Sequence, residues 1–134
     1  EISNFALPRF RSKHNSNYWN RTDYLGLGPS AHSFRGNKRW WNVSNNNHYI
    51  KSWAEGVASF ETEVLSDKDV RNEQIMVGLR RKEGISLEEI PSRDSNEKLK
   101  EFKKKGWITL SGSSIKMTES GWLMSDYVAG ELFF

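Results

Sequence analysis

A regular succession of helix caps and stops in the second half of the chain constrains its fold more than any other feature. Capping patterns at 66–69 and in SLEE at 86–89 each open a helix, and a Gly or Pro ends each of them. A third stretch turns Leu99 and Phe102 inward and its lysines outward. The pattern predicts helices over 66–82, 86–90 and 96–105.

Two short apolar runs follow these helices and predict a β-hairpin. WITL at 107–110 and IKM at 115–117 flank a Ser/Gly turn, and Thr118 is placed to cap a final helix. The final helix carries three apolar or aromatic residues, namely Leu123, Tyr127 and Val128. Helices, a two-stranded wing and a last helix follow one another in the order of a winged helix. We therefore predict a winged-helix-like domain over 61–134.

Residues 1–60 have a different character and predict loops, short strands and one helix. Tyr18-Trp19 and the run 24–27 flank NRTD, which favours a strand–turn–strand hairpin. Gly26 and Gly28 in that run permit close backbone approach or unusual dihedral angles. A short helix is expected to start near residue 46 or 47. The predicted fold class is therefore α+β, with an irregular segment ahead of the winged-helix-like domain.

The composition excludes several kinds of site. None of the 134 residues is cysteine, so the chain supplies no disulfide, thiol nucleophile, thiolate zinc site or cysteine-held iron–sulfur cluster. No run is long enough for a transmembrane helix, and there is no signal-peptide pattern. These features favour a cytoplasmic protein. The chain begins with Glu1 rather than Met, from which we expect a segment of a longer protein.

Charge is distributed unevenly along the chain. Residues 1–51 contain eight Lys and Arg against two Asp and Glu, a net of +6, which leaves the remainder at −3. The basic half is also rich in Trp and Tyr. Such a surface suits an anionic partner, either a nucleic acid or a cofactor with carboxylates or phosphates, and an ordinary solvated face is the alternative.

The predicted helix at 96–105 is the element that would enter a DNA groove if this were a nucleic-acid-binding winged helix. Its phosphate-binding candidates are Lys98, Lys100, Lys103, Lys104 and Lys105. Glu97 and Glu101 stand among them, and no Asn, Gln or Arg within the helix is well placed to read base edges. Nucleic-acid binding is therefore disfavoured but stays open as an alternative function.

Several segments together resemble a known family. They occur in the order EISNFA at 1–6, Pro8, HNSNYW at 14–19, YLGLGPSAHSF at 24–34 and NEQIMVGLRRKEGI at 72–85. This series resembles the C-terminal region of the oxygen-independent coproporphyrinogen III oxidase-like radical SAM proteins, and within them the haem chaperones of the HemW type. The resemblance implies a HemN C-terminal domain over 61–134 and a post-barrel segment over 1–60.

The resemblance also implies cofactors and partners. The intact protein would carry a radical SAM barrel with a [4Fe–4S] cluster and S-adenosylmethionine, neither of which this segment would hold. It would bind haem or another porphyrin and pass it to a haem-accepting client, for which a membrane-associated protein is one candidate. By itself the segment would not be catalytic. An oxygen-independent coproporphyrinogen III oxidase, which acts in porphyrin biosynthesis, is the alternative within the family, so whether the intact parent is an enzyme stays open.

The HNxxYW signature of the HemW type, which the family associates with haem, matches His14, Asn15, Tyr18 and Trp19. His14 is then the candidate ligand of the haem iron, since a neutral imidazole nitrogen binds iron well. Tyr18 and Trp19 would cover a face of the macrocycle. Its propionates would pair with nearby cations, for which the candidates are Arg9, Arg11 and Lys13.

Two further observations concern a second histidine and two departures from the family pattern. His32 is a weaker candidate ligand or pocket residue, with a purely structural role favoured. Ser30 stands where the family pattern GPGAHS has glycine, and Arg9 follows Pro8 where the family commonly has Pro-Gly.

Overall fold

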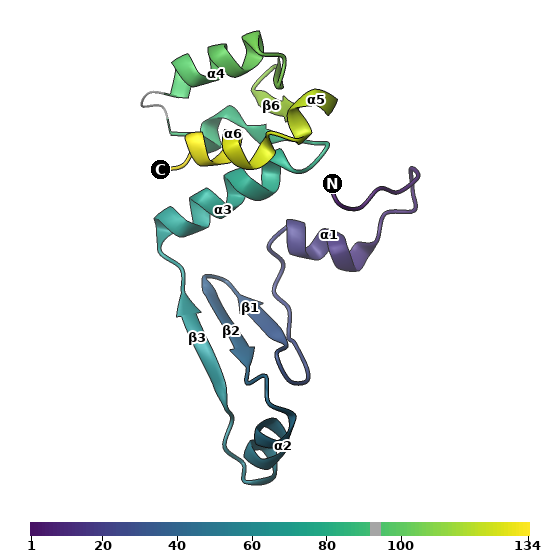
Figure 1. Ribbon diagram of the computed structural model, residues 1–134, viewed down its shortest axis with the longest axis vertical. Coiled ribbons are helices and arrows are strands. Elements are labelled where there is room, and N and C mark those ends of the chain that lie inside the picture. Colours follow the sequence, from purple (N-terminus) through teal and green to yellow (C-terminus); the bar gives the residue numbers. More distant parts are fainter. Residues whose placement is uncertain (92–94) are drawn as a thin grey trace. The chain divides into compact units, whose positions relative to one another are not determined.

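A computed structural model describes residues 1–91 and 95–134, which form two compact units. We call Lys13–Ser66 the sheet unit, and Glu1–Ser12 together with Asp67–Phe134 the helical unit. Both combine helices with a small antiparallel sheet, as Figure 1 shows. The predicted α+β class is therefore confirmed.

The helical unit follows the predicted order of elements. It contains α3 (Asp67–Leu79), β4 (Ile85–Ser86), the 3-10 helix η1 (Leu87–Glu89), α4 (Ser95–Lys104), β5 (Ile108–Ser111), β6 (Ser114–Met117), α5 (Glu119–Trp122) and α6 (Ser125–Glu131). The predicted hairpin is β5–β6, and β4 pairs antiparallel with the other side of β6. Assignment of this arrangement to the winged-helix class stays a prediction.

Side-chain caps set two of the element boundaries, as the sequence indicated. The Ser86 hydroxyl accepts a hydrogen bond from the backbone N–H of Glu88 at the start of η1. Thr118 accepts one from the N–H of Gly121, 3.0 Å away, and so caps α5. These contacts satisfy N–H groups that have no partner within the helix.

The single final helix predicted after Thr118 is wrong, because two short helices, α5 and α6, occupy that part of the chain. Gly121 packs so closely on Trp107 that a Cβ added to Gly121 would lie 1.9 Å from the carbonyl oxygen of Trp107. This approach fixes the direction of α5, and the chain changes course before α6. Leu123, which was expected on the apolar face of that helix, falls in the connection between α5 and α6 and is 92% exposed.

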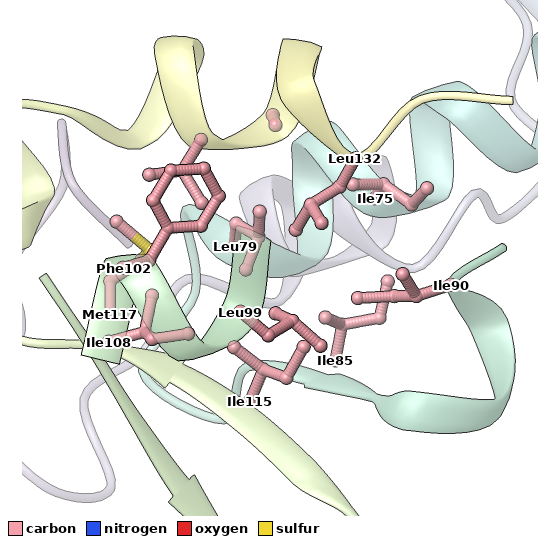
Figure 2. Packing of buried hydrophobic residues seen from close by; sticks show 12 residues of the cluster. Ile75, Leu79, Ile85, Ile90, Leu99, Phe102, Ile108, Ile115, Met117 and Leu132 are labelled. Atoms are coloured by element: carbon pink, nitrogen blue, oxygen red, sulfur yellow. The ribbon is translucent and has the colours of Figure 1, made fainter. Parts of the chain in front are cut away.

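One apolar core holds the helical unit together (Figure 2). Residues from α3, α4, α6 and all three strands contribute to it, and several of them have no solvent exposure at all. Leu99 and Phe102 of α4 point into this core, as the sequence predicted. The buried set is Ile75, Leu79, Ile85, Ile90, Leu99, Phe102, Ile108, Ile115, Met117, Val128, Ala129 and Leu132.

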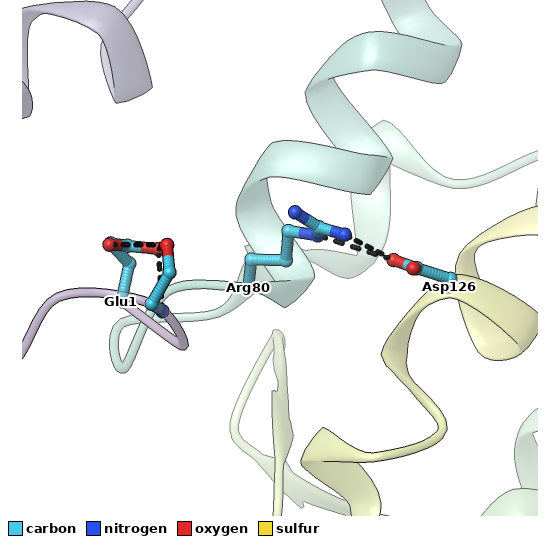
Figure 3. A network of polar contacts seen from close by, with 4 residues as sticks. Glu1, Arg80 and Asp126 are labelled. Carbon is cyan, nitrogen blue, oxygen red and sulfur yellow. Dashed lines mark hydrogen bonds and ion pairs between the residues drawn. The ribbon is translucent and has the colours of Figure 1, made fainter.

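The first residues of the chain pack on the helical unit. The N–H of Ile2 donates to the carbonyl of Arg80, and the rings of Phe5 and Trp122 lie 5.9 Å apart. Figure 3 shows the Glu1 carboxylate in the N-terminal turn and the guanidinium of Arg80, which donates two hydrogen bonds to Asp126. Residues 1–12 thus pack on residues distant in the sequence.

The sheet unit is built on three antiparallel strands in the order β1-β2-β3. Its elements are α1 (Lys13–Trp19), β1 (His32–Arg35), β2 (Lys38–Asn42), α2 (Asn46–Ala54) and β3 (Phe60–Val64). Gly36 turns β1 into β2 with a φ of +63°, which favours glycine. The helix predicted near residue 46 is α2, and the side chain of Asn45 caps it.

The hairpin predicted from Tyr18-Trp19 and residues 24–27 is wrong. Tyr18 and Trp19 are the last residues of helix α1, which contains the whole HNSNYW motif. Its Asn, Ser and His residues are weak helix formers, so the sequence pattern gave no helical signal. Tyr24 instead pairs with Phe34 of β1 through two backbone hydrogen bonds.

Truncation of a buried leucine should lower the free energy of unfolding much more than truncation of an exposed one. Leu79 has no exposed surface, so we expect Leu79→Ala to lower the free energy of unfolding by about 2–5 kcal/mol. Leu123→Ala is the matched control and should cost less than about 0.5 kcal/mol. Denaturant unfolding followed by circular dichroism measures both, and equal effects would contradict this packing.

The ion pair between Arg11 and Glu83 should make a small, pH-dependent contribution to stability. The hydrogen bond from Arg11 lowers the pKa of Glu83 below its ordinary value of 4.5, against the raising effect of partial burial. Stability from this pair is complete above the unfolded-state pKa and is lost as the pH falls through the lowered folded-state pKa. Both side chains are largely exposed, so Arg11→Gln should cost under about 1 kcal/mol at pH 7.

Denaturant unfolding across a pH series measures this difference, while NMR titration follows the Glu83 carboxyl. The variant should raise the pKa of Glu83, and the stability difference from wild type should disappear at acidic pH. A difference that grows as the pH falls would show that Arg11 acts through another contact.

Candidate functional site

The HNSNYW motif lies on one short helix, which brings two of its predicted site residues together. His14 and Tyr18 are four residues apart on α1, the spacing at which helical side chains meet. The Tyr18 hydroxyl lies 3.0 Å from Nε2 of His14, and the rings meet edge to face with centroids 5.0 Å apart. Both side chains are exposed, Tyr18 to 43%, so the imidazole is accessible to a ligand.

An aromatic row continues from these two residues into the sheet. We define it as His14, Tyr18, Tyr24 and Phe34. The rings of Tyr18 and Tyr24 lie 4.7 Å apart, and those of Tyr24 and Phe34 are stacked at 6.2 Å. Phe34 is only 5% exposed, whereas the other end of the row faces solvent. The row therefore runs from the buried Phe34 of β1 to the exposed imidazole of His14.

The two remaining motif residues, Asn15 and Trp19, are half-buried on the same helix. Asn15 has an interaction within the structure. The sequence assigned both to haem by resemblance, and that assignment stays a prediction.

Arg21 joins the aromatic row just after α1 ends. Its guanidinium carbon lies 4.9 Å from the centroid of the Phe34 ring, which is a cation–π contact. The sequence analysis did not single out Arg21, Tyr24 or Phe34, because no local pattern brings residues from a helix end, a loop and a strand together.

His32, the weaker candidate ligand, stacks on Trp41 of the neighbouring strand. Their ring centroids lie 5.7 Å apart, and the two residues are cross-strand partners. His32 and Phe34 are two residues apart on β1, so their side chains share one face of the sheet. The imidazole of His32 is thus on the face that also carries the buried end of the aromatic row.

Glycines beside this face act as the sequence indicated. A Cβ on Gly26 would lie 2.1 Å from the carbonyl oxygen of His32, so the backbones approach closely there. Gly28 has a φ of +107°. Ser30 has a φ of +58°, a left-handed conformation that explains why glycine suits this position in the family pattern.

The basic residues expected to pair with propionates differ in their surroundings. Arg11 is engaged by Glu83 and, like Arg9, belongs to the helical unit. Lys13 is the exposed first residue of α1. Lys98 of α4 pairs with Glu131, and Lys105, which follows α4, pairs with Glu101, so both pairs reduce the positive charge offered to a phosphate backbone.

Two kinds of feature are absent from the described residues, 1–91 and 95–134. No group of three or more His, Cys, Asp and Glu there has the arrangement of a metal site. No helix in the same ranges has the length and apolar character needed to cross a membrane.

Comparison with known proteins identifies the relatives of the chain. The HemN C-terminal domain family matches residues 65–124. The chain is 33% identical to the haem chaperone HemW of Bacillus subtilis over 138 aligned residues, covering 97% of the chain and 36% of that protein. It is 38% identical to the Lactococcus lactis HemW over 93 residues, covering 69% of the chain and 24% of that relative.

A solved structure supports the fold. The chain resembles the coproporphyrinogen III oxidase HemN of Escherichia coli, a radical SAM enzyme, with a TM-score of 0.62 over 81% of the chain and 28% of the enzyme, at 21% identity. The chain spans about a quarter to a third of the length of these relatives. The chain carries a HemN C-terminal domain and is related over nearly its whole length to haem chaperones of the HemW type.

Proposed function

We propose that this chain is the haem-binding part of a haem chaperone, with His14 as the iron ligand. The observation that carries the proposal is the aromatic row, in which the exposed imidazole of His14 contacts Tyr18 and the rings of Tyr24 and Phe34 continue the row. The HemW relatives bear the name of haem chaperones, which favours haem transfer over coproporphyrinogen oxidation. The protein would act in the cytoplasm and deliver haem to an acceptor protein.

The residues fit the chemistry of haem. Imidazole nitrogen is a strong ligand of haem iron when it is neutral, and His14 is exposed. Aromatic rings suit the apolar face of a porphyrin, and they bring little conformational freedom to lose on binding. Cluster and S-adenosylmethionine chemistry would come from other parts of the protein, because this chain contains no cysteine.

The hydrogen bond between His14 and Tyr18 bears on how the iron is bound. Nε2 of His14 faces the Tyr18 hydroxyl at 3.0 Å, so ligation through Nε2 displaces that contact. The helix places the hydroxyl one turn from the imidazole, where it competes with the iron for the same nitrogen. The site would therefore hold haem less tightly than a bare histidine would, which suits a protein that passes its cargo on.

Removal of the imidazole should abolish ligation. We expect His14→Ala to lose the Soret shift that haemin gives with wild type and to weaken binding by at least tenfold. His48→Ala is the matched control, because His48 is also exposed in the sheet unit and contributes only its backbone N–H to the Asn45 cap of α2. Visible absorption during haemin titration measures both variants.

An unchanged Soret band in His14→Ala would remove His14 as ligand. If His32→Ala lost the band instead, the ligand would be the imidazole stacked on Trp41. Loss in both single variants would indicate that the two histidines bind the iron together.

Removal of the competing hydroxyl should strengthen ligation. Tyr18→Phe keeps the ring that packs on Tyr24 but not the hydrogen bond to His14. We expect haemin to bind up to about fivefold tighter, which corresponds to the net worth of one hydrogen bond. Haemin titration with competition by free imidazole measures the change. Loss of the Soret band in this variant would instead identify the tyrosine oxygen as the iron ligand.

A further inference from the structure

We propose that the outer edge of β3 binds an extended segment of a partner protein in which apolar and basic residues alternate. Such a segment would add a further strand to the sheet β1-β2-β3 and would be held mainly by backbone hydrogen bonds. The inference goes beyond the proposed haem binding and does not depend on it. It follows from the backbone direction, the exposure and the charge of β3, whose sequence is FETEV.

The backbone of β3 alternates between two sides. The strand lies at an edge of the sheet, next to β2 (Figure 1). On the side of β2, the N–H of Val43 donates to the carbonyl of Ser59. The N–H of Leu65 donates to the carbonyl of Asn37, and both pairs continue the β2–β3 register. Because hydrogen-bonded pairs alternate along an antiparallel ladder, the positions between them turn their N–H and C=O groups outward. These outward positions are Phe60, Thr62 and Val64.

The side chains of β3 leave this edge accessible. All five residues are exposed, Phe60 to 49% and Val64 to 61%. Alternation puts these two on one face of the sheet with Thr62 between them, and Glu61 and Glu63 on the other face. The strand contains no proline or lysine, two residues that commonly protect an edge from pairing. Another strand can therefore reach the outward backbone groups.

The two glutamates determine which strand fits. If two copies of β3 paired antiparallel about Thr62, Glu61 of one copy would stand opposite Glu63 of the other, and like charges in such positions repel. Glu63 also lies 3.7 Å from Arg39 of β2, so Glu61 is the carboxylate more available to a partner. A basic residue opposite the glutamates would be attracted, and apolar residues would lie beside the apolar side chains of β3. The charge thus favours a basic and apolar segment over a second copy of this chain.

The test is an NMR titration of the chain with two seven-residue peptides that are blocked at both ends. One peptide alternates Lys and Val, and the other has Glu in place of each Lys. Thr62→Pro removes an outward N–H, whereas the bonds to β2 are made by other positions and stay in place. Thr62→Ala is the matched control, because it loses the side chain but keeps the N–H. Circular dichroism verifies that each variant folds.

We expect the Lys-Val peptide to shift the amide signals of Phe60, Thr62 and Val64 and to slow their hydrogen exchange. Thr62→Pro should bind this peptide about fivefold more weakly or worse, which is the net effect of one hydrogen bond, and Thr62→Ala should stay within about twofold of wild type. Wild type should bind the Glu-Val peptide more weakly than the Lys-Val peptide, and Glu61→Lys should reverse that preference.

Three results in the titration would overturn the proposal. They are the absence of any shift at β3, equal binding of the Lys-Val peptide by Thr62→Pro and wild type, and equal affinity of wild type for both peptides. If Thr62→Pro did not fold, the preference of Glu61→Lys between the two peptides would decide.

Two other occupants of the edge would also be recognised. A dimer in sedimentation equilibrium that Thr62→Pro abolishes would identify a second copy of the chain. Binding of the Lys-Val peptide by the chain but not by a longer protein that contains it would identify another segment of the same protein. Either result would overturn the assignment of this edge to a separate partner.

Discussion

The backbone pairing of Tyr24 with Phe34 is the contact on which the candidate site depends. Two hydrogen bonds, of 3.0 and 2.9 Å, attach the segment after α1 to the edge of β1. Without them, the short helix that carries His14 would have little to hold it, since it has no fully buried residue of its own. Burial of Phe34 supplies the apolar side of the same attachment. A strand pairing thus positions a helical motif, and the ring contacts follow from it.

The helical unit was largely predictable because its signals are local. A hydroxyl followed by acidic residues, as in SLEE, specifies a helix start within four residues, and the Ser/Gly turn between two apolar runs specifies β5–β6. Leu99 and Phe102 were expected to be inward from spacing alone. The break between α5 and α6 was not visible, because it depends on Gly121 meeting Trp107, fourteen residues earlier in the chain.

The sheet unit was less predictable because its contacts are not local. HNSNYW is poor in helix formers, yet the pairing of His14 with Tyr18 and the cap at Arg21 complete a helix. The Gly-Asn pair at 36–37 is a hairpin signal between β1 and β2 that the sequence analysis passed over. Family resemblance identified His14 and Tyr18, whereas Tyr24, Phe34 and Arg21 come together only through the fold.

Three non-glycine residues, Arg9, Arg21 and Ser30, adopt left-handed backbone conformations. In each of them, the left-handed backbone lowers the stability of the fold by roughly 1 kcal/mol or more relative to a right-handed or extended backbone. Arg9 and Ser30 stand where the resembled family pattern has glycine. Substitution of either by glycine would relieve this backbone strain. At Arg21 the same change would discard the cation beside Phe34. The stability that a glycine would gain at Arg21 is therefore offset by the cation–π contact that it would lose.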